Sequence, residues 1–322
     1  MKIAAIHLSD AHFDCTNNPI FHKTERMCQS IRDIAIEVED IFVMFTGDIA
    51  YSGSVLEYQK ASEFIDSVKA RIRAYSGKKA HIIMVPGNHD CNFAAEENEA
   101  RQTLVRNVRE NGDSSINESV IKNCCQIQRA YFDLMKKHSD ADNIVFSGEL
   151  IWVIEYCFGA YNIIFNCYNT AWVSEPKEEP GKIHFPIRTF PEGRFLRRSN
   201  LTLAIMHHSL NWLNPTNLRD FSNHLENTSH IIFAGHEHVS AKSMKDNLDG
   251  VRTYFINGKV LQDKDQAEDS SFNVVIFDLS QENHKIYQYE WSGASYVVAK
   301  KTEWLLRWSP KFGQVAKSGF CS

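Results

Sequence analysis

Aspartate, asparagine and histidine recur directly after short apolar runs at five separate places along the chain. The five blocks are Asp10-Ala11-His12, Gly47-Asp48, Gly87-Asn88-His89-Asp90, His207-His208 and Gly235-His236-Glu237-His238. One such block alone would be weak evidence, because a strand-end Asp is commonly a helix cap and an Asn readily occupies a tight turn. Carboxylate, amide and imidazole groups without thiolate suit Mn²⁺, Fe or Zn²⁺. Five blocks in the same kind of position therefore predict a metal site.

The elements that must position these blocks alternate between strand and helix over the first ninety residues. Apolar runs at 3–8, 41–45 and 81–85 indicate strands, and 21–38 and 55–73 indicate helices. This alternation favours a mainly parallel sheet covered on both faces. Ligands of such sheets gather where the carboxyl ends of the strands open into loops. We therefore expect the first three blocks to meet at one edge of a sheet.

The rest of the chain completes an α/β pattern. Further strands are predicted at 143–146, 151–157, 161–167, 201–206, 230–234, 253–256, 272–277 and 285–291. Helices at 96–109 and 121–137, with a polar break at 111–115, form a helical insertion at about 93–140, which is either a lid, an accessory lobe or an ordinary surface insertion. The proline- and charge-rich stretch 174–182 is a predicted loop. We expect one domain over residues 1–292 and a C-terminal extension, 293–322, packing on it.

Composition limits the classes of function. The chain has 322 residues, 43% of them hydrophobic, which suffices for a large α/β core. A net charge of −5 argues against a protein that coats nucleic acid. No apolar run is long enough to span a bilayer, and the N-terminus turns polar too soon for a signal peptide. Eight cysteines without a CxxC pair favour reduced thiols and a cytoplasmic location.

In its five blocks the sequence resembles the calcineurin-like metallophosphoesterase superfamily, and the matching motifs run from near the first residue into the last third of the chain. The resemblance implies an α/β fold, a four-layer α-β-β-α sandwich of two stacked mixed sheets flanked by helices. It also implies two divalent metal ions, with Mn²⁺ favoured over Fe or Zn²⁺. One ion would be held by Asp10, His12, Asp48 and His238, and the other by Asp48, Asn88, His207 and His236, so that Asp48 bridges them.

The resemblance also implies roles in catalysis. A hydroxide between the two metals would attack phosphorus in line. His89 would stabilise or protonate the leaving oxygen, and Asp90 would orient the His89 ring.

His207 and His208 leave one ligand open, since neighbouring side chains on a strand point opposite ways. Family members often show His-His-Pro here with the first histidine as ligand, whereas Ser209 stands in place of that proline. We favour His207 and keep His208 as the alternative.

The stretch after the bridging aspartate bears on the substrate. Protein serine/threonine phosphatases of the superfamily carry an Asp-Arg pair where Tyr51 and Ser52 stand here, so the phosphate-clamping arginine is missing. The sequence from Gly47 to Gly53, followed by Glu57-Tyr58, looks more like the cyclic-nucleotide-phosphodiesterase-like branch of bacteria. The Gly-Asn-His-Asp and Gly-His-Glu-His variants are also similar to those of DNA-repair nucleases. Hydrolysis of a phosphodiester is therefore expected, with cyclic nucleotide and nucleic acid both open as substrates.

A nuclease would need a basic groove with stacking aromatic side chains. The candidates are Arg194, Arg197 and Arg198 with Phe190 and Phe195, the pairs Lys78-Lys79 and Lys136-Lys137, and the tryptophans Trp291, Trp304 and Trp308. A solvated surface for the charges and packing for the tryptophans are the better interpretations. The remaining alternative is a binding or partner-gated effector module of a larger assembly, although the full ligand set speaks against a silent member. Oligomeric state and protein partners stay open.

Overall fold

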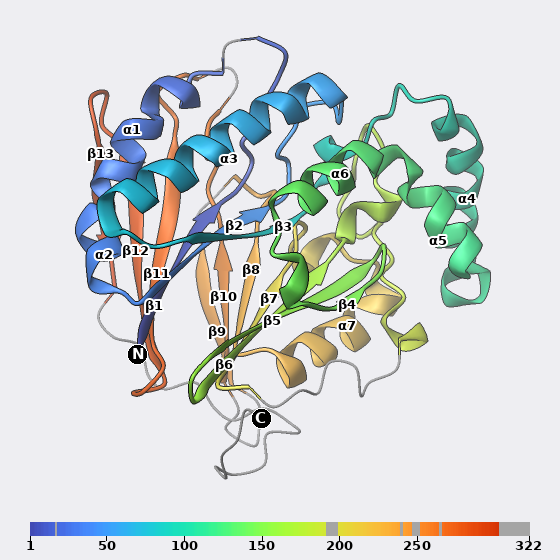
Figure 1. Cartoon of the computed structure of the whole chain (residues 1–322). Helices are drawn as coiled ribbons and strands as arrows, with labels where there is room; N and C mark the ends of the chain where they lie inside the picture. Colours follow the sequence, from blue (N-terminus) through green and yellow to red (C-terminus); the bar gives the residue numbers. More distant parts are fainter. Residues whose placement is uncertain (17, 191–198, 239–240, 247–251, 264–265, 303–322) are drawn as a thin grey trace.

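Two mixed β-sheets lie face to face at the centre of the molecule (Figure 1). The computed structural model describes residues 1–16, 18–190, 199–238, 241–246, 252–263 and 266–302. The first sheet has the order β13 (Tyr296–Lys301), β12 (Asn283–Trp291), β11 (Ser271–Asp278), β1 (Lys2–Leu8), β2 (Asp40–Thr46), β3 (Ala80–Val85). The second has the order β4 (Ile144–Ser147), β5 (Ile151–Phe158), β6 (Tyr161–Tyr168), β7 (Leu201–Ile205), β8 (Ile231–Ala234), β10 (Arg252–Asn257), β9 (Lys242–Asp246).

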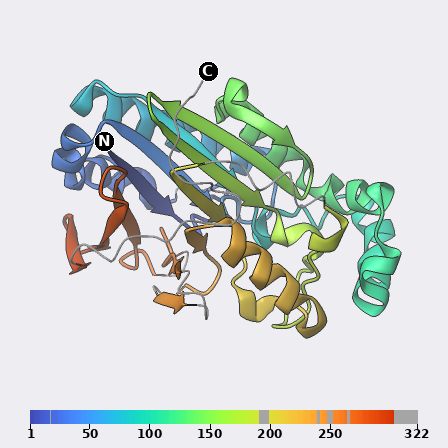
Figure 2. The ribbon, with the colours of Figure 1, turned by 90° about the horizontal axis from the view of Figure 1, so that it is seen from below.

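Helices cover the outer faces of both sheets, as the two views show (Figures 1 and 2). On the first sheet lie α1 (Ile20–Ser30), α2 (Arg32–Glu37) and α3 (Val55–Ser76), and α7 (Pro215–Thr228) covers the second. The main apolar core fills the space between the sheets and under α1 to α3, and a second cluster lies between the second sheet, α7 and the helical insertion. The predicted sandwich of two mixed sheets flanked by helices is confirmed.

Each sheet contains a parallel block, and these blocks position the five motifs. In the first sheet β1, β2 and β3 run parallel, and in the second β6, β7, β8 and β10 do. Nearly all residues of β1 and β2 are buried, as expected for strands covered on both faces. All five motifs follow the carboxyl ends of strands in these two blocks, so they meet at one edge of the sandwich.

Helix α3 has clear start and stop signals in the sequence. The Ser54 side chain accepts from the backbone N–H of Glu57, and the Glu57 carboxylate accepts from the backbone N–H of Ser54, which is a capping box. Gly77 ends the helix at φ +73°, a conformation that glycine adopts without strain. The predicted helix 55–73 therefore agrees closely with the structure.

Two predicted helices are divided. The stretch 21–38 forms α1 and α2 with a break at Ile31, and 121–137 forms α5 (Glu118–Cys125) and α6 (Arg129–His138) with a 3₁₀ turn between them. In the second case tertiary partners compete for the backbone. The carbonyl of Cys124 accepts from Arg101 Nε at 2.9 Å, and that of Ile127 accepts from the N–H of Asn92 at 2.8 Å. Both carbonyls thus bond outside the helix.

The sequence-based prediction missed two strands, β9 and β13, each of which lies at an edge of its sheet. Residues 242–245 of β9 are exposed, and in β13 every residue except Tyr296 is exposed, so their apolar signal is weak. Because β13 pairs with β12, the described part of the segment after residue 292 belongs to the first sheet. The division of the chain at that residue stays a prediction.

The helical insertion consists of α4 (Glu97–Asn111), α5 and α6. Val105 and Val108 of α4 and Cys124 of α5 pack into the second apolar cluster. The insertion is therefore a packed lobe, and a lid function stays a prediction. None of the helices in the described ranges is both long and apolar enough to cross a bilayer.

Candidate metal centre

The backbone of the motif loops is held in an unusual conformation. Five of the predicted metal ligands have left-handed φ angles: Asp10 (56°), His12 (47°), Asp48 (52°), His236 (69°) and His238 (51°). Among the other described residues, Glu282 is the one non-glycine position that shares this feature. Such conformations are uncommon outside glycine and persist where the surrounding structure enforces them, often at functional sites. The fold thus imposes the same local geometry on ligands from three different loops.

Glycine permits the close approach of these loops. A Cβ on Gly87 would overlap the Asp48 carboxylate, and a Cβ on Gly47 would overlap the ring of His207. Gly47 also has a φ of +92°, which glycine adopts readily. The glycines of the second and third motifs are therefore required for packing rather than as ligands.

The first predicted metal position lies between Asp10, His12 and His238, whose ligand atoms fall within 4.8 Å of one another. Asp10 is fully buried, and its Oδ2 accepts from the hydroxyl of Ser9 and from the backbone N–H of His236 at 3.2 Å. Its Oδ1 accepts no regular hydrogen bond from the described residues and faces Nε2 of His238 at 3.3 Å. A buried carboxylate oxygen that accepts no hydrogen bond raises the free energy of the folded state unless a cation lies next to it. These residues therefore fit a metal ion.

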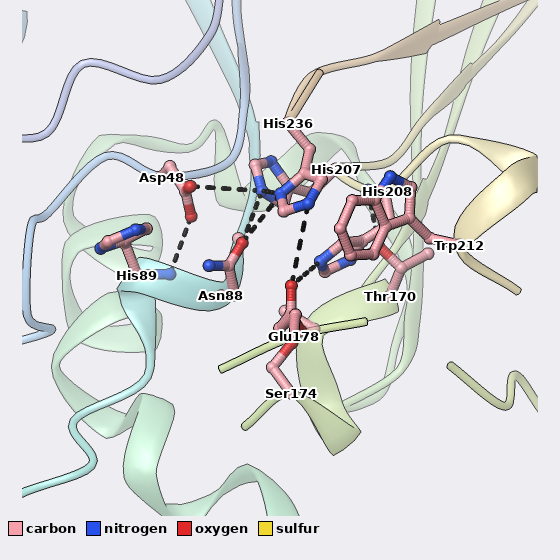
Figure 3. Close-up of polar contacts among 12 residues, drawn as sticks. Asp48, Asn88, His89, Thr170, Ser174, Glu178, His207, His208, Trp212 and His236 are labelled. Carbon is pink, nitrogen blue, oxygen red and sulfur yellow. Dashed lines mark hydrogen bonds and ion pairs between the residues drawn. The ribbon is translucent and has the colours of Figure 1, made fainter. Parts of the chain in front are cut away.

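The second predicted position lies between Asn88, His207 and His236. Asn88 Oδ1 lies 3.0 Å from His207 Nε2 and 3.1 Å from His236 Nδ1, and the two ring nitrogens are 3.1 Å apart. Ligand atoms about 2.1 Å from a common ion would be separated by about 3.0–3.4 Å. The three atoms thus have the spacing of ligands that share one ion (Figure 3).

Asp48 lies between the two positions. Its Oδ2 is 3.5 Å from Nε2 of His12 and 3.4 Å from Nε2 of His207. Its Oδ1 accepts from the backbone N–H of His89 at 2.8 Å. One carboxylate oxygen therefore faces a histidine of each predicted set, as a bridging ligand would.

Electrostatics couple these groups strongly. Burial alone would lower the pKa of His207, but the carboxylates of Asp48 and Asp10 outweigh it and raise that pKa to about 10. Burial alone would raise the pKa of Asp48, but His207 and His12 hold it well below its usual range. For His236, burial followed by the neighbouring His208 and His207 lowers the pKa to about 3. Since a metal competes with the proton for the same nitrogen, binding of an ion at the predicted positions would be coupled to proton release.

His89 lies beside the first position. A nitrogen of its ring falls within 4.8 Å of ligand atoms of His12 and Asp48. Its Nδ1 donates to the carbonyl of Tyr51 at 2.7 Å, so this nitrogen carries the proton and Nε2 is left for other chemistry. The Tyr51 ring also packs on that of His89, with centroids 5.3 Å apart.

The expectation that Asp90 orients the His89 ring is wrong. The Asp90 carboxylate accepts from the backbone N–H groups of Gly87 (2.8 Å), Ile49 (3.2 Å) and Ala50 (2.9 Å) and from the Tyr58 hydroxyl (2.8 Å). Burial, and then the nearby Asp48, raise its pKa to about 6. Asp90 therefore ties the second motif loop to the third, because it is buried beneath both loops and turned away from the imidazole. Tyr58 supports the same junction from α3.

The side chains of His207 and His208 point in different directions, as the alternation of side chains along a strand predicts. His207 turns toward Asp48 and Asn88, and its Nδ1 donates to the carbonyl of Thr46 at 2.7 Å. His208 turns to Thr170 and Glu178, with its Nε2 at 2.9 Å from Glu178 Oε2 (Figure 3). The geometry favours His207 as the ligand.

Sequence reasoning missed three residues beside the second position, namely Thr170, Glu178 and Trp212. The Trp212 ring packs against His236 with centroids 4.1 Å apart and planes at 87°. Glu178 lies in the stretch predicted only as a loop, where no periodicity marks one side chain as buried. Its carboxylate lies 3.9 Å from Nε2 of His236. No spacing rule connects these residues to the motifs, since they meet through the tertiary fold alone.

Several of the basic and aromatic candidates for a nucleic-acid groove lie outside the described residues, and others form hydrogen bonds to groups that are not part of the predicted metal site. Arg194, Arg197, Arg198, Phe195, Trp304 and Trp308 lie outside the described residues. Lys78 donates to the carbonyls of Ala35 and Ile36, and Lys137 donates to Ser62. Within the described ranges, no Lys or Arg pairs with the predicted metal ligands.

Comparisons with known proteins point to one family. The family model described as calcineurin-like phosphoesterase matches residues 3–240. The chain is 22% identical over 306 residues to the uncharacterized metallophosphoesterase-like protein YydB of Bacillus subtilis (strain 168). That alignment covers 91% of this chain but only 60% of the relative.

One solved structure shares the fold of this chain, and a second gives a weaker alignment. Purple acid phosphatase PPD1 from seeds of yellow lupin (Lupinus luteus) aligns with a TM-score of 0.51 and 10% identity, covering 100% of this chain and 57% of that one. A dimetal phosphatase from Danio rerio aligns with a TM-score of 0.42 and 13% identity, covering 93% and 98%.

Proposed function

The chain belongs to the calcineurin-like phosphoesterase family, and on this premise we propose that it hydrolyses a phosphodiester with the help of two divalent metal ions. The observation that carries the proposal is the position of Asp48 Oδ2, 3.5 Å from His12 Nε2 and 3.4 Å from His207 Nε2. In the sandwich, this oxygen is the point where ligands from both sheets converge. When bound, two such ions neutralise charge on a phosphoryl group and make water a nucleophile at neutral pH.

The residues of the site have two proposed roles, binding of the metal ions and transfer of a proton. The proposed ligands of one ion are Asp10, His12, Asp48 and His238, and those of the other are Asp48, Asn88, His207 and His236. His89 is the proposed proton donor to the leaving oxygen. Its Nδ1–H donates to the Tyr51 carbonyl, so the imidazolium form of the ring would carry its second proton on Nε2 and would give that proton to the leaving oxygen. Asp90 acts at a distance by holding the loops that carry Asp48 and His89.

Two features favour a diester over a monoester dianion. In the described ranges, no Lys or Arg forms a hydrogen bond or ion pair with the proposed ligands, so none is placed among them to neutralise the second charge of a monoester dianion. In addition, Tyr51 is 36% exposed, and its ring packs on His89. An exposed aromatic ring next to the proton donor suits an organic group esterified to the phosphate.

Oxygen and nitrogen ligands without thiolate support Mn²⁺ as the proposed metal, with Fe and Zn²⁺ as alternatives. A cytoplasmic location is proposed from cysteine usage, since the eight cysteines are scattered along the chain without a CxxC pair.

The test is turnover by metal-stripped protein reconstituted with Mn²⁺. Substrates would be bis-p-nitrophenyl phosphate, p-nitrophenyl phosphate, cyclic nucleotides, and single- and double-stranded DNA and RNA. We expect faster hydrolysis of the aryl diester than of the monoester, abolished in Asp48→Asn. Preference for the monoester would overturn the diester proposal. Preference for DNA or RNA over cyclic nucleotides would favour the nuclease alternative.

A partner-gated effector or binding module is the second candidate. It is supported by the length of the Bacillus subtilis relative, of which this chain covers 60%. Two bound metals with no turnover on any of these substrates would favour it.

A further inference from the structure

Glu178 places a carboxylate behind one of the proposed metal ligands. The side chain is 8% exposed, and its Oε2 lies 3.9 Å from Nε2 of His236 (Figure 3). The other ring nitrogen of His236, Nδ1, faces Asn88 and His207. When Nδ1 of a histidine binds a metal, Nε2 carries the proton and points away from the ion. Glu178 therefore lies on the side of His236 that would be protonated.

His208 fixes Glu178 in this place. The backbone N–H of His208 donates to Thr170 Oγ1 at 3.1 Å, so the Thr170 hydroxyl is free to donate its own proton to His208 Nδ1 at 3.0 Å. Nε2 of His208 then carries the ring proton and donates it to Glu178 Oε2 at 2.9 Å. Each polar atom of the His208 ring thus has a partner of the correct kind, and the carboxylate is held by a directed hydrogen bond.

The helical lobe holds the segment that carries Glu178. Arg101 of α4 is 1% exposed, and its Nη2 donates to the carbonyls of Trp172 (2.9 Å) and Ser174 (2.8 Å). Arg109, two turns further along α4, pairs with Glu175 and donates to the carbonyl of Val173. The chain is thereby fixed just ahead of Glu178.

Trp212 packs against the His236 ring and restricts its movement from a second direction. Its ring packs edge to face on His236, and its Nε1 donates to Glu237 Oε1 at 2.7 Å. By contrast His238, the corresponding histidine of the other set, has a side chain that is 45% exposed. His236 is therefore more closely packed than His238.

We propose that Glu178 is a positioning residue for one metal position alone: it orients His236 and strengthens ion binding by Asp48, Asn88, His207 and His236. The set of Asp10, His12 and His238 is independent of it. This inference rests on the proposed dinuclear function and adds an asymmetry to it. Loss of a carboxylate behind a ligating histidine typically lowers metal affinity by about 10–100-fold.

The experiment is a Co²⁺ titration of the metal-stripped full chain, followed by the visible absorption of the bound ion and by calorimetry. The first variant, Glu178→Gln, keeps the size of the side chain but removes its charge. The second, Glu178→Asp, keeps the charge but moves the carboxylate away from His236, because the side chain is one methylene shorter. Glu179→Gln, the same chemical change at the exposed neighbouring residue, is the matched control. Melting of the metal-free variants reports whether the fold is intact.

We expect two ions per wild-type chain, and in Glu178→Gln one of the two affinities should fall by about 10–100-fold with a changed spectrum. Glu178→Asp should lose less, and Glu179→Gln should match the wild type. Unchanged affinities in Glu178→Gln, or an equal loss of both ions with a lowered melting temperature, would overturn the inference. A wild-type chain that binds fewer than two ions would instead overturn the dinuclear proposal itself.

Discussion

The backbone N–H of His89 donates a hydrogen bond to Oδ1 of Asp48 at 2.8 Å. This bond occupies one carboxylate oxygen and leaves Oδ2 facing His12 and His207. The loop that carries the proposed proton donor thus also orients the proposed bridging ligand. Because the backbone makes the contact, substitution of the His89 side chain preserves it, so that binding and turnover can be separated by mutation.

Asp48→Asn should lose both metal ions together with activity. The charge of one carboxylate serves both positions, and an amide replaces it poorly for a divalent cation. Metal content per chain, measured by mass spectrometry after dialysis, checks this. Asp33→Asn, at an exposed position of α2, is the control. Retention of either ion at the wild-type affinity would contradict a bridging role.

His89→Ala should keep both ions and lose turnover by about 10²–10⁴-fold, the usual contribution of a general acid. The Asp48 hydrogen bond survives in this variant because it comes from the backbone. Metal content and kcat, measured on the same preparation of the variant, test this prediction. If the variant loses its metals, His89 is a ligand and the division proposed above between ligands and proton donor fails.

Tyr51→Ala should raise KM for an aryl diester about five- to tenfold, more than it lowers kcat, because an aromatic contact for the organic group is lost. Tyr51→Phe should behave as the wild type, since the ring and the carbonyl that accepts from His89 both remain. Steady-state kinetics on bis-p-nitrophenyl phosphate checks this. An unchanged KM in Tyr51→Ala would exclude the Tyr51 ring from substrate binding.

Stability should fall above neutral pH because of His81, which lies far from the metal centre in β3. Its Nδ1 lies 2.5 Å from Asp140 and its Nε2 lies 3.1 Å from Asp40. Burial alone would lower the pKa of His81, but the two carboxylates outweigh it and raise that pKa from 6.5 to about 9. A raised pKa in the folded state means that the stabilisation is complete below pH 6.5 and is lost as pH rises through about 9.

Urea unfolding at pH 6 and pH 9.5 tests the role of His81. The free energy of unfolding of the wild type should decrease between these values more than that of His81→Gln. Lys79 and Tyr156 also contact Asp140, and both residues are present in the two proteins compared. His22→Gln, the same substitution at an exposed position, is the matched control. Equal pH dependence in His81→Gln and the wild type would show that the ion pairs contribute nothing.

Arg101→Met should destabilise the chain by about 3 kcal/mol or more. The substitution removes charge-assisted hydrogen bonds to the carbonyls of Cys124, Trp172 and Ser174 and leaves these buried groups unpaired. Unfolding in urea measures the cost, with Arg106→Met on the exposed face of the same helix as the control. A change within about 0.5 kcal/mol, as for ordinary surface positions, would contradict this role.

Much of the fold could be predicted from the sequence. The strands of the two parallel blocks appeared as apolar runs because they are buried on both faces. The predicted ligands could be named for the same reason, since polar residues that follow such strands must meet at one edge of the sheet. The edge strands β9 and β13 gave no comparable signal, because nearly all of their described side chains are exposed.

The sequence by itself thus determined the ligand types and their positions at strand ends, because both depend on local periodicity. Tertiary structure alone decided where each side chain points. It turned Asp90 away from His89, directed His208 to Glu178, and brought Glu178 from a loop without periodicity to His236. These contacts join residues that are far apart in the chain, and they depend on packing and on the hydrogen-bond needs of buried groups. No spacing rule encodes such contacts, since the fold must form before the partners of each group exist.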